Sequence, residues 1–374
     1  MSSGVKMVAA AAAGGAAASV IYSKLSERSS VSGEASSNGK APLRVMVSGA
    51  AGQIGYSLLP LIASGQALGE QQEIILHLLD IAPALGALGG VKMELEDGAY
   101  PLLKGVVVTA EAAEALADVD VAVFVGGFPR GPGMLRKDLI AKNCGIFSAQ
   151  GKALEQVAKK SCKILVVANP ANTNCLILKE NAPSIPSENF TCLTRLDLNR
   201  AKFQIAQRAL CKVQDVSNVA IWGNHSDTQF PDAFNAHVVR NSVKLSVSDA
   251  VDDNDWLEND FIKTVQQRGK AVIDARKLSS AMSAANAIKD HLRTWLVTGT
   301  KPGETTSMGV WSNGNPYGVQ GGLIFSFPVH IENGAVSISN DYKVNSFAQN
   351  KIQITEKELL EEWTDAKAAL ASQK

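Results

Sequence analysis

The sequence predicts an α/β protein in which a doubly wound parallel sheet is followed by an α+β domain. Two observations carry this expectation. From Pro42 onward, short apolar runs alternate with segments of helical periodicity, which is the pattern of the βα units that build a parallel sheet. After Asn169 and Pro170 the pattern changes to longer helical segments and a late stretch of alternating residues. We therefore predict one domain at residues 42–193 and a second at 194–374.

The first strand–turn–helix unit is the most regular part of the pattern. An apolar run at 43–48 ends in a glycine turn at 49–55, and residues 56–62 continue in helical spacing. A second strand is predicted at 73–80. Further strands are predicted at 106–109, 119–125 and 163–167, and helices at 111–117 and 137–160.

The second domain is predicted to contain helices at 196–211 and 260–287, followed by strand-like alternation at 322–339. Residues 355–372 read as an amphipathic helix with glutamates in its first half and Thr355 as its N-cap.

Composition argues against several classes of protein. The 36 Lys and Arg residues balance 36 Asp and Glu residues, so no overall field attracts nucleic acid or an acidic membrane surface. The five cysteines lie far apart without a C-x-x-C pair, and no histidine stands at metal-ligand spacing. We expect reduced thiols, an intracellular protein, no bound metal, and neither nucleic acid nor membrane as a partner.

Residues 1–41 form an extension of different composition, rich first in Ala and Gly and then in Ser and Gly. We expect it to lie outside the fold, either as a disordered tail or as a targeting segment. Basic residues without acid before Glu27 suit an organellar transit peptide, although arginine is scarce. The uncharged run at 7–22 is too short and too rich in Ala and Gly for a membrane-spanning helix.

The glycine turn predicts a dinucleotide site. Gly49, Gly52 and Gly55 form a G-x-x-G-x-x-G variant of the Rossmann-type fingerprint, with Gln53 and Ile54 inside it. Backbone N–H groups can approach a pyrophosphate closely there, and the helix N-terminus supplies partial positive charge. A tight turn without a ligand is the alternative.

Asp80 ends the next predicted strand, 25 positions after Gly55. A carboxylate there can accept hydrogen bonds from both hydroxyls of the adenosine ribose, and its charge would repel a 2′-phosphate. NAD is therefore predicted rather than NADP. A helix cap or turn before Pro83 is the alternative role for Asp80.

A histidine and a carboxylate suited to proton transfer follow. Asp197 and Arg200 share a face at the start of a predicted helix, and His225 follows an apolar strand at a glycine-containing turn. Oxidation of an alcohol releases a hydride to the cofactor and a proton to a base. We expect His225 to accept that proton, and Asp197 to fix the imidazole tautomer and stabilise the imidazolium. Asp197 and Arg200 could instead form a structural ion pair.

Arg130 and Arg136 lie in a glycine-rich loop after the predicted strand 119–125, on the side where open α/β sheets bind ligands. A loop that closes would exclude water and bring guanidinium groups onto a substrate. A surface loop with solvated arginines is the alternative.

From about Pro42 to the C-terminus, the chain resembles the cytosolic-type malate dehydrogenases of the lactate/malate dehydrogenase superfamily. The matching stretches are S-G-A-A-G-Q-I-G at 48–55, L-L-D-I at 78–81, P-R and G-M-L-R-K-D within 129–138, A-N-P-A-N-T-N at 168–174, L-T-R-L-D-L-N-R-A at 193–201, W-G-N-H-S at 222–226, T-V-Q-Q-R at 264–268, L-S-S-A-M-S-A at 278–284 and S-M-G-V at 307–310.

The resemblance implies reversible oxidation of (S)-malate to oxaloacetate with NAD. It implies that Arg200 holds the C1 carboxylate, that Arg136 polarises the carbonyl being reduced, and that Arg130 grips the distal carboxylate of a dicarboxylic substrate. The planar fork of arginine suits each carboxylate better than lysine would.

The resemblance also implies that Asn169 contacts substrate and nicotinamide, that Asn143 contacts the cofactor, and that Ser280 lies at the nicotinamide end. It implies a cytoplasmic homodimer, with a mitochondrial or plastid location through residues 1–40 as the alternative. Two positions depart from the family pattern: Leu198 stands where histidine is usual, and Asp227 where serine is usual.

Two other functions remain open at this point. A lactate or broad 2-hydroxyacid dehydrogenase would need a neutral residue in place of Arg130. A catalytically silent NAD-binding sensor would not need to keep Asp197, His225 and the arginines.

Overall fold

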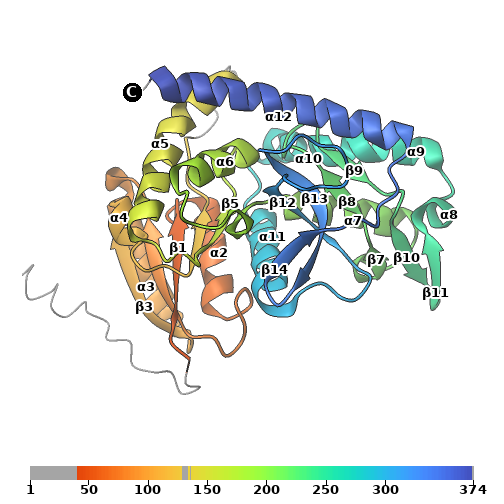
Figure 1. The fold of residues 1–374 in the computed structure, drawn as a ribbon. Coiled ribbons are helices and arrows are strands. Elements are labelled where there is room, and N and C mark those ends of the chain that lie inside the picture. Colours follow the sequence, from red (N-terminus) through yellow and green to blue (C-terminus); the bar gives the residue numbers. More distant parts are fainter. Residues whose placement is uncertain (1–39, 129–133, 135, 373–374) are drawn as a thin grey trace, which may run out of the picture. The chain divides into compact units, whose positions relative to one another are not determined.

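The computed structural model describes residues 40–128, 134 and 136–372 of the 374. Contacts between residues divide the chain into two compact units, 1–42 and 43–374. All helices and strands that the structure describes lie in the second unit (Figure 1). The predicted extension 1–41 therefore falls almost wholly outside the described residues.

A nine-stranded sheet runs through the second unit in the order β14-β13-β12-β6-β5-β4-β1-β2-β3. The six strands from β6 to β3 are parallel. They span β1 Leu43–Ser48, β2 Ile74–Leu79, β3 Leu103–Thr109, β4 Val121–Phe124, β5 Lys163–Val166 and β6 Phe190–Cys192. The order reverses between β1 and β4, which confirms the predicted doubly wound fold.

Three antiparallel strands from the second half of the chain extend the same sheet, because Gly309 of β12 pairs with Cys192 of β6. They are β12 Thr306–Trp311, β13 Ile324–Glu332 and β14 Ala335–Ile338. Two smaller sheets complete the β structure, formed by β7 Val216–Ser217, β10 His237–Arg240 and β11 Val243–Ser246, and by β8 Ala220–Trp222 with β9 Phe230–Asp232. The large sheet thus crosses the predicted boundary at 193/194.

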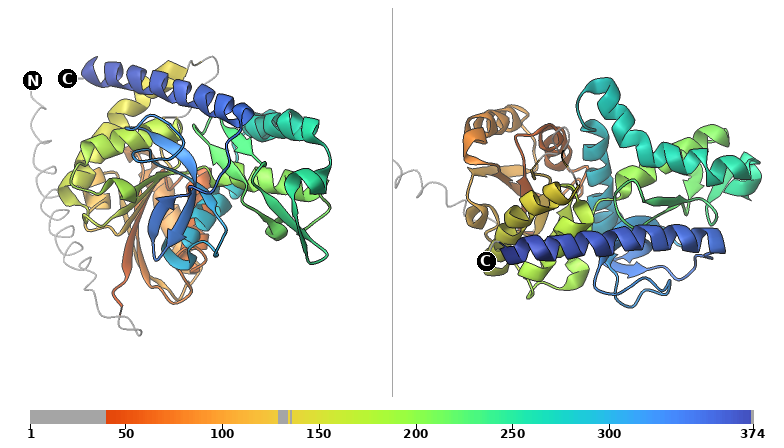
Figure 2. Two further views of the ribbon diagram at one scale, coloured as in Figure 1. Left: turned by 45° about the vertical axis from the view of Figure 1, so that its right-hand side comes forward. Right: turned by 90° about the horizontal axis from the view of Figure 1, so that it is seen from above.

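Helices cover both faces of the parallel sheet (Figures 1 and 2). The α-helices are α2 Gln53–Ala63, α3 Leu85–Asp97, α4 Ala112–Ala115, α5 Arg136–Val157, α6 Ala171–Asn181, α7 Arg195–Arg208, α8 Val247–Val251, α9 Asn254–Glu258, α10 Asp260–Arg276, α11 Met282–Arg293 and α12 Ser346–Ser372. Short 3₁₀ turns lie at Ala82–Ala84, Ser187–Asn189 and Val213–Asp215, and a π-helical turn at Thr294–Thr298 continues α11.

Alternate residues of the parallel strands feed two separate cores. Val45 and Val47 of β1 pack with residues of α2, α3 and α11, whereas Met46 packs with residues of α5, α6 and α12. A sheet buried on both faces explains why its strands read as continuous apolar runs. A third core fills the second half of the chain around Trp222 and Phe325.

Two predicted helices were wrong in extent. The helix predicted at 260–287 is two helices, because Lys277 adopts a left-handed backbone (φ 62°) that ends α10 at Arg276. The C-terminal helix begins at Ser346, so Thr355 lies inside α12 and is not its N-cap. Instead, Thr355 is fully buried and bonds to another part of the chain.

None of the helices among the described residues is both long and apolar enough to cross a membrane.

Candidate active site

The predicted cofactor residues lie where parallel strands end. Gly49 follows β1, Asp80 follows β2, and Gly126 comes two residues after β4. Because the carboxyl ends of parallel strands share one edge of the sheet, the chain folds these loops together at the point where the strand order reverses.

Gly49 and Gly126 pack backbone against backbone. Gly49 has a positive φ of 63°, and a Cβ built on it would lie 2.5 Å from the Cα of Gly126. A Cβ on Gly126 would in turn lie 2.7 Å from the amide nitrogen of Gly49. A side chain on either residue would collide with the backbone of the other, so only glycines allow the two loops to pack this closely. We call these two backbone segments the cradle, because glycine backbone of this kind suits the close approach of a pyrophosphate.

The N-terminus of α2 opens onto this cradle. Its N-cap residue is Gly52, which has an extended backbone and offers no side chain to cap the first N–H groups of the helix. The first turn of α2 also contains no acidic residue. A Cβ on Gly55 would lie 2.7 Å from both the Cα and the carbonyl oxygen of Ala50, so the helix packs directly on the turn. This arrangement suits an anion at the helix terminus.

Asp80 faces the glycine turn. Its Oδ2 accepts a hydrogen bond from the backbone amide of Ala51 at 3.0 Å, and its Oδ1 accepts one from Ile81 at 2.8 Å. The side chain is partly exposed. It is therefore held beside the cradle, in a position suited to the ribose hydroxyls of a dinucleotide.

The predicted proton pair comes together. His225 lies in the turn that joins β8 to β9, which we call the His225 turn (residues 223–228), and Nδ1 of its imidazole donates to Oδ2 of Asp197 on α7. The Asp197 carboxylate has no exposed surface, whereas the His225 side chain keeps 19% of its own. One end of the imidazole is thus fixed and the ring still reaches solvent.

The charge state of Asp197 sets the tautomer of His225. Burial opposes ionisation of this carboxyl, but His225 and Arg200 outweigh it and hold the pKa of Asp197 below its ordinary value. An ionised carboxylate only accepts hydrogen bonds, so the proton belongs on Nδ1 of the imidazole. The Nε2 lone pair of His225 is then available to receive a proton.

Arg200 lies on the same side of α7 as Asp197. Its Nη1 is 2.9 Å from Oδ1 of Asp197, and its Nη2 reaches Oγ of Ser280 at 3.5 Å. The residues between α10 and α11 deliver Ser280 to this point, so the helix break at Lys277 builds part of the site. Arg200 and Asp197 do form an ion pair, and that pair also lies beside the imidazole.

Asn143 is completely buried and holds backbone in place. Its Oδ1 accepts from the amide of Phe128 at 2.9 Å, and its Nδ2 donates to the carbonyl of Leu139 at 3.0 Å. A longer bond of 3.4 Å reaches the carbonyl of Asn169, whose own side chain is exposed after β5. Asn143 thus ties the start of the arginine loop to the end of β5.

Arg130 lies outside the described residues. Arg136 begins α5, and its side chain is likewise outside the description. The structure therefore gives no contact for either arginine.

Residues that the sequence motifs did not single out anchor the His225 turn. Oδ1 of Asn172, which is buried on α6, accepts from the amide of His225 at 2.9 Å, and Nδ2 of Asn172 donates to the carbonyls of Gly223 and Ile324. From α12, Glu358 and Glu362 accept from the side chain of Asn224. The distance along the chain hid these contacts, although the A-N-P-A-N-T-N stretch contains Asn172.

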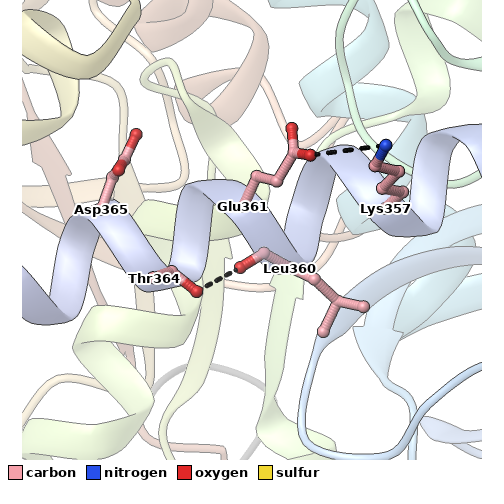
Figure 3. A pocket seen from close by; sticks show the side chains of 5 residues that line it. All are labelled: Lys357, Leu360, Glu361, Thr364 and Asp365. Carbon is pink, nitrogen blue, oxygen red and sulfur yellow. Dashed lines mark hydrogen bonds and ion pairs between the residues drawn. The ribbon is translucent and has the colours of Figure 1, made fainter.

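A shallow hollow of about 300 Å³ lies on the outer face of α12, lined by Lys357, Leu360, Glu361, Thr364 and Asp365 (Figure 3). Lys357 and Glu361 pair there at 3.9 Å. Lys357, Glu361, Thr364 and Asp365 are exposed, whereas Glu358 and Glu362 bond to Asn224, so this hollow is separate from the site around His225.

The comparisons with known proteins agree with this geometry. Residues 43–191 match the lactate/malate dehydrogenase, NAD binding domain, and residues 194–370 match the lactate/malate dehydrogenase, alpha/beta C-terminal domain. The chain belongs to the lactate/malate dehydrogenase family. It is therefore an NAD-dependent oxidoreductase, and the predicted cofactor is confirmed.

Relatives within the family are similar over nearly their whole length. A malate dehydrogenase of Nicotiana tabacum is 57% identical over 323 residues, which cover 86% of this chain and 97% of that protein. A cytoplasmic malate dehydrogenase of Homo sapiens is 54% identical over 332 residues, covering 88% and 99%.

Among solved structures, a malate dehydrogenase of Naegleria fowleri has a TM-score of 0.83 and 44% identity, covering 88% of this chain and 99% of that one. A lactate dehydrogenase of Trichomonas vaginalis in complex with NADH and oxamate has a TM-score of 0.85 and 39% identity, covering 88% and 99%. Similar structures thus serve both substrates, and the fold alone does not select between them.

Proposed function

We propose that the protein catalyses the reversible oxidation of (S)-malate to oxaloacetate with NAD. The observation that carries the proposal is the hydrogen bond between Nδ1 of His225 and the buried carboxylate of Asp197, with the guanidinium of Arg200 on the other oxygen. A base, its orienting partner and a carboxylate-binding cation are what the oxidation of a 2-hydroxy acid needs. The naming of relatives at 54–57% identity as malate dehydrogenases supports the substrate.

In this proposal, NAD supplies the hydride acceptor when it is bound. Nε2 of His225 takes the proton of the substrate hydroxyl, and Asp197 stabilises the imidazolium that forms. Arg200 binds the C1 carboxylate, and Arg136 polarises the carbonyl oxygen.

We assign the choice of a dicarboxylic substrate to Arg130. A guanidinium pairs with a second carboxylate through two hydrogen bonds, whereas the methyl group of pyruvate cannot pair with that charge. This assignment matters because a lactate dehydrogenase shares the fold at a TM-score of 0.85. It rests on the P-R pair at 129–130 in the sequence.

We assign the cofactor contacts to the carboxyl edge of the sheet. The cradle of Gly49 and Gly126, the open N-terminus of α2 and the carboxylate of Asp80 support this placement. The proposed contacts are Gly49, Gly52, Gln53, Ile54 and Gly55 with the pyrophosphate and Asp80 with the ribose. Asn143 is proposed to contact the cofactor, Asn169 the substrate and the nicotinamide, and Ser280 the nicotinamide end of the site. In this scheme residues 42–193 supply most of the cofactor contacts together with Arg130 and Arg136, and residues 194–374 supply Asp197, Arg200 and His225.

A substrate panel tests the proposal. NADH oxidation is measured with oxaloacetate, pyruvate and 2-oxoglutarate, and repeated with NADPH. We expect turnover with oxaloacetate and NADH to exceed every other combination by at least about a hundredfold in kcat/KM. Preference for pyruvate would assign the chain to lactate chemistry, and absence of turnover with all three would favour an NAD-binding sensor.

We further propose a homodimer through the face formed by α2, α7, α10 and α11. These helices pack on one another, and each leaves an apolar side chain exposed: Tyr56, Phe203, Ile273 and Met282. Met282 is the most exposed of the four, at 77%. Sedimentation velocity should give a dimer that Met282→Glu dissociates and that Val243→Glu, on the exposed strand β11, leaves intact.

We propose an intracellular location and give preference to the cytoplasm, since the human relative carries that name. The family match begins only at residue 43, so residues 1–42 are additional to the family fold. Fluorescent fusions of the full chain and of residues 42–374 decide the matter. Delivery of the full chain alone to mitochondria or plastids would make residues 1–40 a targeting segment.

A further inference from the structure

The two faces of α12 make different contacts. The outer face carries the hollow of Figure 3, where Lys357 and Glu361 pair along the helix. The inner face carries Thr355, Glu358 and Glu362, spaced three and four residues apart, and all three bond to the His225 turn. A helix that begins more than 120 residues after His225 thus supplies acceptors to the turn that holds it.

Glu358 gathers donors from three residues of the turn. Its Oε2 accepts from Nδ2 of Asn224 at 2.9 Å, from Oγ1 of Thr228 at 2.6 Å and from Oγ of Ser226. Asn224 and Ser226 are the immediate neighbours of His225. One carboxylate oxygen therefore holds the side chains of the residues on both sides of His225.

Glu362 bonds the same side-chain amide of Asn224 from one turn further along α12. It is buried, its Oε1 accepts from Nδ2 of Asn224 at 2.7 Å, and its Oε2 accepts from Oγ1 of Thr173 at 2.6 Å. Thr173 follows Asn172, whose own side chain bonds the amide of His225. The turn is thereby joined to α6 and α12 together.

Thr355 completes the contact at the start of the turn. Its Oγ1 accepts from the amide of Asn224 at 2.8 Å, and it packs so closely that a Cβ on Gly223 would lie 2.0 Å from its Cγ2. Gly223 also has a positive φ of 89°. No residue other than glycine fits between β8 and α12 at this point.

We propose that Glu358 is a positioning residue for the proton transfer, with Glu362 and Thr355 as its supports. Hydrogen bonds to a carboxylate are stronger and more directional than those between neutral groups. With three of them on one oxygen, Asn224 and Ser226 hold the imidazole of His225 at the angle at which Nδ1 meets Asp197. The proposal rests on the function proposed above, because it concerns the base of that reaction.

Glu358→Ala tests the proposal, with Glu358→Gln and Glu361→Gln as comparisons. The amide introduced by Glu358→Gln keeps an acceptor oxygen but loses the charge, and Glu361 is an exposed carboxylate on the outer face of the same helix. We expect Glu358→Ala to lower kcat for oxaloacetate by about tenfold to a hundredfold, because small displacements of a base carry a cost of this order. Glu358→Gln should stay within about fivefold of the wild type, since one acceptor is retained. Glu361→Gln should match the wild type.

The affinity for NADH distinguishes positioning from loss of fold. The cofactor cradle lies on the sheet edge and has no contact with Glu358, so the dissociation constant from NADH fluorescence should stay within about twofold in every variant. The kcat is expressed per NADH-binding site. An unchanged kcat in Glu358→Ala would overturn the proposal, and so would a loss in Glu361→Gln equal to that in Glu358→Ala, which would indicate a general effect on α12.

If Glu358→Ala does not fold, Thr228→Val removes a donor to the same oxygen without altering α12. A fall in kcat of about threefold or more, with NADH affinity retained, supports the proposal, and an unchanged kcat overturns it. Inactivity of the wild type with oxaloacetate would refute the proposed function instead, so the two failures are distinguishable.

Discussion

Asp197 and His225 are 28 residues apart in sequence, yet Oδ2 of the fully buried Asp197 carboxylate accepts a hydrogen bond from Nδ1 of His225. Asp197 keeps its charge there because His225 and Arg200 both stabilise the carboxylate, with Nη1 of Arg200 on its other oxygen at 2.9 Å. The same carboxylate therefore connects the proposed base to the proposed carboxylate-binding residue. We therefore expect a change that affects His225 to lower kcat, and a change at Arg200 to weaken substrate binding.

Asp197→Asn should remove the proton acceptor role of His225 while preserving shape. An amide beside Nδ1 can present its N–H₂ group, which favours the tautomer with the proton on Nε2 and blocks that atom as a base. We expect kcat for malate oxidation to fall by about 10³-fold or more at pH 8, with NADH affinity unchanged. A fall of less than about tenfold would show that Asp197 does not set the tautomer.

Arg200→Lys should act on substrate binding. A lysine ammonium cannot bond Asp197 and span a carboxylate with two parallel N–H groups. We expect kcat/KM for oxaloacetate to fall by about a hundredfold or more. Arg208→Lys is the matched control, because Arg208 lies on the same helix with an exposed ion pair to Asp253. Equal losses in the two variants would point to a general effect on α7.

The sequence allowed the fold and the cofactor edge to be predicted because those features are local. The run 43–55 contains strand, turn and helix in order, and Asp80 follows at the end of the next strand. Spacing also placed Asp197 and Arg200 on one face, because they lie on the same helix. Motif context was enough to select His225 among five histidines.

The supports of the site depend on long-range packing, and no local pattern contains that information. Thr355 looked like a helix cap because hydroxyls favour caps, yet it faces Gly223 from the third turn of α12. The break at Lys277 was missed because lysine rarely adopts a left-handed backbone. Thr355 bonds the residue before His225, and the break at Lys277 allows Ser280 to reach Arg200. Both contacts depend on the tertiary fold.

Gly49→Ala should damage the cofactor site. The added methyl would meet Gly126 at 2.5 Å, and the positive φ of Gly49 disfavours any side chain. We expect the dissociation constant for NADH to rise by about tenfold or more, with a lower Tm. Gly86→Ala on α3 is the contrast, since a Cβ there meets nothing within 4 Å. That variant should bind NADH normally and raise stability by up to about 1 kcal/mol. Normal NADH binding by Gly49→Ala would mean that the cradle is not the pyrophosphate site.

Arg130→Gln should change substrate preference. Glutamine cannot neutralise a second carboxylate, so kcat/KM for oxaloacetate should fall by about a hundredfold or more while that for pyruvate rises. Lys137→Gln removes a positive charge from an exposed position on α5 and should change neither value. If oxaloacetate turnover is barely altered and pyruvate turnover does not improve, another residue selects the dicarboxylate.

His291 should make stability depend on pH. It is fully buried on α11, and burial, together with the nearby charge of Arg195, lowers its pKa to about 3. The hydroxyl proton of Thr191 is donated to the carbonyl of Ile164. Nε2 of His291, which lies 3.2 Å from Oγ1 of Thr191, must therefore donate its own proton to that hydroxyl oxygen. Nδ1 is then unprotonated, and no hydrogen-bond partner for it lies among the described residues. A proton added there would be buried without an acceptor.

The sign of the effect follows from these two states. In the unfolded chain His291 gains a proton as the pH falls below 6.5, whereas in the folded chain it does so only near pH 3. The stability that neutral His291 contributes is therefore complete above pH 6.5 and is lost on acidification, by at most about 1.4 kcal/mol per pH unit. Asp232 acts in the opposite direction, because burial raises its pKa from 3.8 to about 6 and acidification in that range favours the folded state.

Urea unfolding of the wild type and of His291→Gln, measured in parallel, tests this prediction, because the contribution of Asp232 is the same in both proteins and cancels in the difference. The variant should be less stable at pH 7, and the difference should shrink by about 2 kcal/mol by pH 5. A difference that stays constant from pH 7 to pH 5 would mean that His291 takes up a proton as easily in the folded protein as in the unfolded chain.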